Sequence, residues 1–148
     1  MGTCIFCSII AGHQAASVVY EDAIVCAFLD INPVNPGHVL VVPKTHLPCV
    51  ADMDEVVGGH LFKVSMRLDR TLRRSGLRCD GVNLFLADGV EAGQEVPHVH
   101  IHVIPRFKGD VFRIEADWSA RPSRPELDHY AEQLRHAYET MSNSLHDD

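Results

Sequence analysis

The sequence predicts one α+β domain built on a five-stranded antiparallel sheet, and three observations support this prediction. The chain has 148 residues, which is enough for one domain with a core of its own. Short runs rich in β-branched residues are separated by short turn segments, a pattern typical of antiparallel strands. One longer segment repeats its apolar residues at steps of three and four, as an amphipathic helix does.

The N-terminal part of the chain predicts a short helix followed by three strands. Residues 4–10 have isoleucines at spacings compatible with a helix. Residues 17–20 and 24–29 predict a hairpin. Residues 38–42 form a β-branched run between prolines, which predicts the third strand.

The central part predicts one long core helix and two further strands. Residues 54–75 have the helical apolar spacing, and Gly76 follows as a C-cap. Residues 82–87 and 96–104 predict the fourth and fifth strands, with a loop at 88–93 between them.

The end of the chain differs in composition from the rest. Residues 107–125 are rich in charge, proline and turn residues, which indicates an irregular segment. Residues 126–141 predict a C-terminal amphipathic helix, whose apolar face we interpret as a packing surface or a dimer contact. We expect residues 1–110 to form the main domain and residues 111–148 to be an extension within the same globular unit.

Composition excludes several classes of function. The formal net charge is -7 with neutral histidines, and lysine and arginine form no single block, so we expect no nucleic-acid partner. Apolar runs fall far short of the roughly 20 residues of a bilayer span, and a signal-peptide pattern is missing at the start. We therefore expect a cytoplasmic protein with no membrane partner. The odd number of cysteines, five, argues against a disulfide framework.

Three of the ten histidines occupy alternate positions: His98, His100 and His102. On a strand they share one face, while the apolar residues between them take the other. Such a row suits a metal site or a nucleophile with neighbouring proton donors, whereas an exposed polar edge strand is the weaker alternative.

Phosphoryl transfer fits the surroundings of this row better than metal-dependent hydrolysis. The glycine-containing turn at residues 88–94 allows backbone N–H groups to approach an anion. A neutral imidazole attacks phosphorus through Nε2 when an acceptor holds its Nδ1–H. The sequence contains neither a Walker loop nor a dinucleotide-binding fingerprint, so it gives no support to an ATPase or a dehydrogenase.

The run HVHIHVI at residues 98–104 resembles the signature of the histidine triad (HIT) family, and the resemblance covers residues 4–110. Further matches, in order along the chain, are CIFC at 4–7, AFLDINP at 27–33, PGHVLVVPK at 36–44 and AGQ at 92–94. The resemblance implies a HIT-like fold, with a five-stranded antiparallel sheet, one long core helix, a short N-terminal helix and a C-terminal helix. It also implies a homodimer.

The resemblance implies a hydrolase or nucleotidyl transferase that cleaves at the α-phosphorus of purine nucleoside phosphoramidates or related nucleotide conjugates. The reaction would pass through a covalent nucleotidyl-histidine, and the partner would be a purine nucleotide such as AMP or an adenosine conjugate. Three alternatives stay open: a dinucleoside polyphosphate hydrolase, a nucleotide-binding regulatory module with incidental turnover, and a zinc-dependent hydrolase that uses the triad as metal ligands.

Catalytic roles follow from the resemblance residue by residue. It implies that His100 is the nucleophile, that His102 contacts the phosphate and leaving atom, that His38 and His98 support them, and that Asp30 accepts from ribose hydroxyls. The implied substrate-binding residues are Ile5, Phe6, Ile9, Phe28, Leu29, Asp30, Ile31, Asn32, Gly93, Gln94, Glu95 and Val96. Without the resemblance, core packing would be the preferred interpretation of the apolar members.

Two positions depart from the family pattern. Ala87 stands where many members have Asn or Gln near the phosphate, and Glu95 stands where the phosphoramidase branch often has Ser or Thr. Because a carboxylate repels phosphate, we expect Glu95 to offer only its backbone N–H and to turn its side chain outward.

The pair Cys4 and Cys7 has a spacing that suits two thiolate ligands of one tetrahedral metal. His46 and His98 can complete a Cys2His2 set, but their distance along the chain makes spacing alone a weak signal. Resemblance to a zinc-containing, bacterial-type branch of the family at all four positions implies a structural Zn²⁺, and no organic cofactor is implied. The alternative is that both cysteines are reduced thiols packed below the nucleotide cleft.

Overall fold

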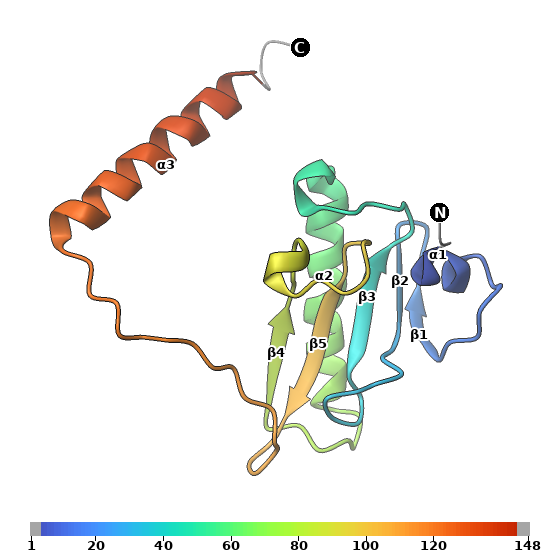
Figure 1. Cartoon of the computed structure of the whole chain (residues 1–148). Coiled ribbons are helices and arrows are strands. Elements are labelled where there is room, and N and C mark those ends of the chain that lie inside the picture. The colour runs from blue at the N-terminus through green and yellow to red at the C-terminus, as the bar shows by residue number, and fades with distance from the viewer. Residues whose placement is uncertain (1–3, 145–148) are drawn as a thin grey trace. The chain divides into compact units, whose positions relative to one another are not determined.

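The structure is a computed structural model that describes residues 4–144, with side chains described as far as residue 141. Within these residues the chain forms one five-stranded antiparallel sheet and three α-helices (Figure 1). The strands are β1 (Val18–Glu21), β2 (Val25–Leu29), β3 (Val39–Pro43), β4 (Gly81–Phe85) and β5 (Ile101–Arg106). The helices are α1 (Ile5–Ile10), α2 (Glu55–Leu72) and α3 (Arg124–Ser144), with 3-10 turns at Val50–Asp52 and Val90–Ala92. The predicted α+β class and antiparallel sheet are confirmed.

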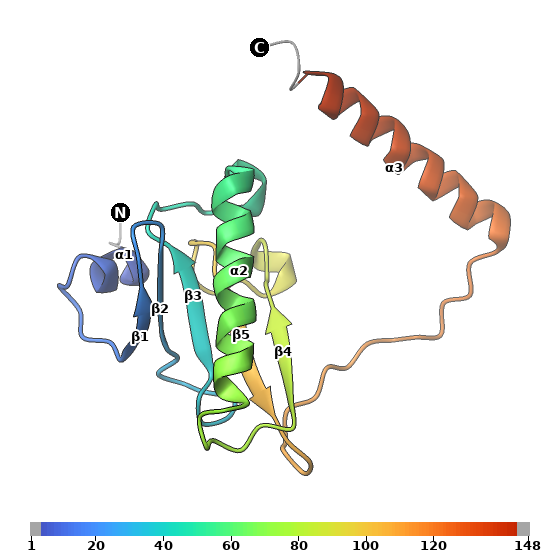
Figure 2. The same cartoon turned by 180° about the vertical axis from the view of Figure 1, so that it is seen from behind.

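The sheet has the strand order β1-β2-β3-β5-β4, and every neighbouring pair is antiparallel. The central pair, β3 and β5, aligns Leu40 with His102. Strands β1 and β4 are therefore the two edges of the sheet. Figure 2 shows α2 lying across one face of the sheet.

Helix α2 and the sheet face that it covers form the main core. Asp54 caps the helix, because its carboxylate accepts from the backbone N–H groups of Val56 and Val57 at 2.8 and 3.3 Å. The buried side of α2 packs against alternate residues of the strands. This cluster includes Leu61, Val64, Leu68 and Leu72 from α2 and Val25, Ala27, Val39, Val41, Val99, Ile101 and Val103 from the sheet side.

A second, smaller apolar cluster lies on the opposite face of the sheet. Phe6 of α1 packs there with Cys26, Phe28, Leu40 and Val42, whose side chains alternate with those of the main core. Helix α1 thus covers the β2–β3 part of this face. The β5 part of the same face carries the histidines.

The predicted fifth strand, residues 96–104, is wrong at both ends, since β5 begins at Ile101 and ends at Arg106. Its neighbour β3 ends at Pro43, which has no N–H to continue the ladder. Residues before β5 instead bond to a loop, with Val99 N–H donating to Leu47 O at 2.7 Å. The alternation of side chains continues through this irregular stretch, so the face predicted for the triad histidines is retained although two of them precede the strand.

The chain divides into two compact units, of which the first ends at Phe112 and the second begins at Arg113. The second unit contains α3, which extends the predicted helix at both ends. Its apolar stripe is exposed along the described length and consists of Leu127, Tyr130, Leu134, Tyr138 and Met141. That the extension belongs to the same globular unit stays a prediction. Among the helices that the structure describes, none is both long and apolar enough for a bilayer crossing.

Candidate active site and metal centre

The triad histidines lie in a row on the face opposite α2. His98 and His100 are buried, and His102 is half-buried. The rings of His100 and His102 are 4.8 Å apart between centroids. The Phe6 ring meets His100 edge to face at 5.2 Å, so α1 supports the row from the side.

The main chain fixes the proton of His100. Its Nδ1 lies 2.7 Å from the carbonyl oxygen of His98, which can only accept a hydrogen bond. Nδ1 therefore carries the proton, and the neutral ring keeps a lone pair on Nε2. This is the form of imidazole that acts as a nucleophile.

A chain of hydrogen bonds places the proton of His102 on Nε2, whereas the proton of His100 is on Nδ1. The backbone N–H of Val34 donates to His38 Nδ1 at 3.2 Å, so the proton of neutral His38 is on Nε2. His38 Nε2 lies 2.9 Å from His102 Nδ1 and donates to it. The proton of His102 is consequently on Nε2, the nitrogen available to a ligand. We call Val34, His38 and His102 the histidine relay.

Asp30 stands at the far end of this relay. Its Oδ2 lies 3.6 Å from His38 Nδ1, while its Oδ1 accepts from the backbone N–H of Asn32 at 2.9 Å. The carboxylate is partly exposed and retains lone pairs for further donors.

Burial keeps these imidazoles neutral. It lowers the pKa of His38, against an opposing effect of Asp30. It lowers the pKa of His102 to about 4, with further contributions from His100 and His38. Burial also lowers the pKa of His98. Near neutral pH the rings of His38, His98 and His102 are therefore uncharged, which suits a hydrogen-bonded histidine pair and a metal ligand.

The predicted apolar substrate positions fall into two groups. Phe6 and Phe28 are buried, and their rings meet edge to face at 5.5 Å. The others keep part of their surface in solvent; these are Ile5, Ile9, Leu29 and Ile31. Ile31 is 91% exposed, which is unusual for an isoleucine and leaves apolar surface beside Asp30 along the chain.

The turn before the triad is held by the Gln94 side chain. Its Oε1 accepts from Gly89 N–H at 2.7 Å, and its Nε2 donates to Pro48 O at 2.9 Å. Gly93 has a φ of +88°, which favours glycine. The side chain of Glu95 is exposed and that of Val96 half-buried. Gln94 therefore shapes the turn with its side chain, a role that the sequence did not predict.

Sequence reasoning missed two contributors to the site. The backbone of Val34 sets the tautomer of His38, and no residue type signals such a role. The ring of Phe85 lies 5.8 Å from that of His102 and is 41% exposed on the edge strand β4. The only signal in the sequence was an aromatic residue within the predicted strand 82–87. Ala87, by contrast, is buried and offers no polar group.

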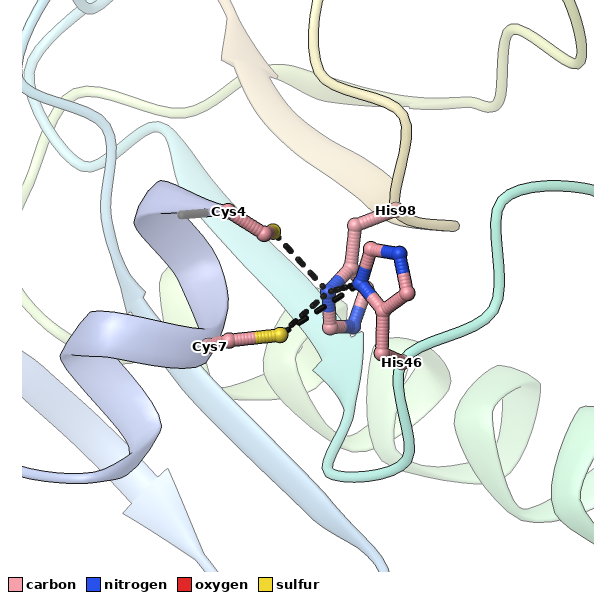
Figure 3. Close-up of side chains that lie close together, drawn as sticks. All are labelled: Cys4, Cys7, His46 and His98. Carbon is pink, nitrogen blue, oxygen red and sulfur yellow. Dashed lines mark hydrogen bonds between the residues drawn. The ribbon is translucent and has the colours of Figure 1, made fainter. Parts of the chain in front are cut away.

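Four predicted metal ligands meet at one point (Figure 3). Cys4 and Cys7 come from the start of α1, His46 from the segment after β3, and His98 from the segment before β5. Cys4 Sγ lies 3.4 Å and Cys7 Sγ 3.6 Å from His98 Nδ1. His46 Nδ1 lies 3.4 Å from Cys7 Sγ and 3.3 Å from His98 Nδ1.

These separations fit a tetrahedral zinc site. Zinc bonds of about 2.0–2.1 Å to nitrogen and about 2.3 Å to sulfur place neighbouring ligand atoms roughly 3.3–3.8 Å apart. His98 Nε2 donates to Pro43 O at 2.8 Å, which leaves Nδ1 unprotonated and directed at the other ligands. Burial and the adjacent Cys4 thiol raise the pKa of Cys7, an effect that a bound cation would oppose. The donor set and its spacing therefore suit Zn²⁺.

A second group of possible ligands consists of Asp30 and the two histidines of the relay, His38 and His102. The two facing nitrogens of its histidines already share a hydrogen bond of 2.9 Å. We therefore interpret His38 and His102 as a hydrogen-bonded pair that sets the protonated nitrogen of His102, and not as metal ligands. A cavity of about 340 Å³ lies elsewhere, between the end of α1 and β1–β2, with Ile9, Cys26 and Glu21 in its lining and no triad histidine.

Comparison with known proteins agrees with this geometry. The HIT domain family model matches residues 11–109. The chain belongs to the HIT family. The predicted family is therefore confirmed, and membership supports the broad class of nucleotide hydrolases and transferases. The more specific roles of individual residues stay predictions.

Relatives of this HIT protein include both sequences and solved structures. An uncharacterized HIT-like protein of Borreliella burgdorferi is 46% identical over 113 residues, covering 76% of this chain and 81% of that protein. Adenylylsulfatase HINT3 of Arabidopsis thaliana is 36% identical over 132 residues, covering 88% and 65%. A Zn-bound histidine triad family protein from Mycobacterium smegmatis superimposes with a TM-score of 0.71 at 37% identity, covering 91% and 97%. This structural match confirms the predicted HIT-like fold.

Proposed function

We propose that this HIT protein hydrolyses or transfers the nucleotidyl group of purine nucleoside phosphoramidates or related conjugates. The observation that carries the proposal is the 2.7 Å bond from His100 Nδ1 to the His98 carbonyl, which leaves Nε2 basic. Nε2 forms a bond to the α-phosphorus while the bond to the leaving group breaks. Water then attacks the nucleotidyl-His100, releasing AMP and the free imidazole.

His102 acts on the leaving group in this proposal. The relay keeps its proton on Nε2, where it can donate to a phosphate oxygen or to the departing atom. The His102 ring is neutral in the free protein, where its pKa is lowered. A bound phosphate is negatively charged and therefore raises the pKa of this ring, which favours uptake of a second proton. His38 accepts from the backbone N–H of Val34 and donates to His102 Nδ1, so it sets which nitrogen of His102 is protonated without contacting the substrate.

The nucleotide binds between α1, the end of β2 and the turn before the triad. Exposed apolar surface on Ile5, Leu29 and Ile31 suits a purine base. Asp30 accepts from the ribose hydroxyls. The backbone N–H groups of Glu95 and Val96 donate to the phosphate in this proposal, because those of Gly93 and Gln94 already donate to Val90 O and Gly89 O. The adenylylsulfatase among the relatives carries an adenylyl-conjugate activity in its name, which supports this substrate class.

We further propose one structural Zn²⁺ held by Cys4, Cys7, His46 and His98, and a cytoplasmic homodimer. Two observations support the zinc, namely the ligand spacing and the Zn-bound relative. Support for the dimer comes from edge strand β4, where Leu84 and Phe85 are exposed, and from Leu86, which is exposed directly after it. An unpaired apolar edge is a surface that a second sheet can extend.

The test is a substrate panel with purified protein. Adenosine 5′-phosphoramidate, diadenosine triphosphate and diadenosine tetraphosphate are assayed side by side, with product AMP measured. We expect kcat/KM to be highest for the phosphoramidate. A preference for a dinucleotide would favour the polyphosphate hydrolase alternative, and binding of AMP without turnover of any substrate would favour the regulatory module.

A further inference from the structure

The metal centre and the nucleophile meet at a single residue, His98. Its side chain contributes Nδ1 to the four-ligand cluster, where both cysteine sulfurs lie within 3.6 Å of that one atom. Its backbone carbonyl accepts the 2.7 Å hydrogen bond from His100 Nδ1. Whatever holds the His98 side chain therefore also holds the group that orients the nucleophile.

Helix α1 connects the two sites a second time. Cys4 and Cys7 hold the start of this six-residue helix against His46 and His98. Phe6, between the two cysteines, packs edge to face on His98 at 5.8 Å and on His100 at 5.2 Å between centroids. A change at the two sulfurs thus reaches the His100 ring through side-chain packing as well as through the main chain.

The two sulfurs are also open to small reagents. Cys4 and Cys7 are half-buried and their ligand partner His46 is exposed. Both sulfurs approach the same nitrogen, and the two cysteines are three positions apart at the start of a helix, a spacing at which disulfides form readily. Cys26, in contrast, is buried, and Cys79 donates to Gly81 O at 3.3 Å.

We propose that Cys4 and Cys7 form a thiol switch that lowers the nucleotidyl-transfer activity when it is oxidised. The oxidant is a hydroperoxide, which accepts two electrons. One sulfur displaces water from hydrogen peroxide and becomes a sulfenic acid, and the second sulfur displaces the second water to form the disulfide. In total, two thiols and one hydrogen peroxide give one disulfide and two waters. From the zinc-loaded chain, whose cysteines would be thiolates, the same oxidation also consumes two protons and releases one Zn²⁺.

Oxidation removes two of the four metal donors, so His98 Nδ1 loses the partners that fix it on that side. His98 keeps its 2.8 Å bond from Nε2 to Pro43 O, and Val99 keeps its bond to Leu47 O. The carbonyl that orients His100 is therefore loosened and not displaced. We expect the single-turnover rate to fall about 10- to 100-fold, the usual effect of losing a supporting interaction around a metal ligand.

The experiment uses the reduced, zinc-loaded full chain and hydrogen peroxide. The disulfide is located by peptide mass mapping, zinc release is followed with a chromogenic chelator, and the single-turnover rate is measured on adenosine 5′-phosphoramidate. Nitrogen-15 NMR of the His100 ring reports its tautomer independently of turnover. We expect a Cys4–Cys7 disulfide, release of about one zinc, a mixed His100 tautomer, and recovery of rate and tautomer after dithiothreitol and zinc are added.

Two variants serve as matched controls. Cys49→Ser removes an exposed thiol that is not one of the four clustered residues, and this variant should respond to peroxide as the wild type does. Cys7→Ser leaves Cys4 as the single cysteine of the cluster, so this variant should form no disulfide there. If Cys49→Ser abolished the response, the switch would lie elsewhere in the chain.

Several results would overturn the proposal: zinc retained after oxidation, a disulfide that leaves both rate and tautomer unchanged, or a loss of rate that reduction does not reverse. The proposal rests on the proposed function only for its rate measurement. If the reduced protein turns over no substrate, the proposed function fails, while the disulfide, zinc and tautomer measurements still decide whether the cysteines control His100.

Discussion

The two ends of the histidine row are held by different kinds of interaction. At one end, His98 and His100 depend on a side-chain cluster of two sulfurs and two nitrogens and on one backbone carbonyl. At the other end, His102 is held by a chain of hydrogen bonds that runs from the N–H of Val34 through His38. The first arrangement links the protonated nitrogen of His100 to a residue whose side chain is a candidate metal ligand, whereas the second sets the protonated nitrogen of His102 through hydrogen bonds alone. Changes at the two ends should therefore alter the reaction in different ways.

The largest effect should come from the nucleophile itself. We expect His100→Ala to lower kcat by about a thousandfold or more, because no other group supplies the bond to phosphorus. The variant should stay folded and keep most of its affinity for AMP. Retention of the wild-type rate by this variant would contradict the assignment of His100.

The next largest effect should depend on the leaving group. We expect His102→Ala to lower the rate about 100- to 10,000-fold on adenosine 5′-phosphoramidate, because an amine must be protonated as it departs. The loss should be much smaller on an adenylate with a low-pKa phenol, which leaves as a stable anion. A larger loss on the phenolic ester would mean that His102 mainly stabilises phosphate charge.

Substitutions at the metal site should lower the rate to the same extent on substrates with different leaving groups. We expect the double variant Cys4→Ser, Cys7→Ser to bind no zinc and to lose about 10- to 100-fold in rate on both substrates. Its Tm should also fall, because zinc at a thousand times its Kd contributes about 4 kcal/mol to the free energy of unfolding. Cys49→Ser is the control. Equal zinc content in the double variant and the wild type would rule out the Cys2His2 site.

Asp30 should affect binding more than chemistry. Hydrogen bonds from ribose hydroxyls to this carboxylate are each worth about 1.5–3 kcal/mol, so wild-type protein should prefer AMP to 2′-deoxy-AMP by at least tenfold in Kd. Asp30→Asn should reduce this preference. Titration calorimetry with both nucleotides and both proteins measures it, and an unchanged preference in the variant would reject the role.

The last effect should appear in the free energy of unfolding and not in the reaction rate, as a change in its dependence on pH. The pKa of His102 is lowered to about 4 in the folded protein, whereas an unfolded histidine titrates near pH 6.5. Between these values the unfolded chain binds more protons, so the free energy of unfolding should fall as the pH falls from 6.5 towards 4. Urea unfolding of His102→Gln should show a shallower slope over this window, and an identical slope would show that His102 does not contribute.

Much of this arrangement was predictable because it depends on local patterns. The spacing of Leu61, Val64 and Leu68 gave the long helix, and the alternation around His100 gave the face of the triad. What the sequence could not supply was the long-range pairing. Pro43 ends its ladder early, so β5 starts later than its β-branched run suggests.

The site shows the same limit. The meeting of Cys4 and Cys7 with His46 and His98 had only weak support from spacing, because those histidines are 39 to 94 positions away from the cysteines that they approach. The tautomer of His38 depends on a backbone N–H, which every residue except proline carries. Such roles become visible only when the three-dimensional contacts are known.

The central claim is that His100 forms the bond to the nucleotide, and the most direct measurement is detection of that bond. A single-turnover reaction with adenosine 5′-phosphoramidate is quenched at high pH, where phosphoramidate linkages survive, and the peptides are analysed by mass spectrometry. The account predicts an adenylyl group on His100 that forms and decays at the rate of turnover, and that is missing in His100→Ala. Adenylylation of another histidine, or turnover without any adduct under conditions that trap one on a control histidine enzyme, would contradict it.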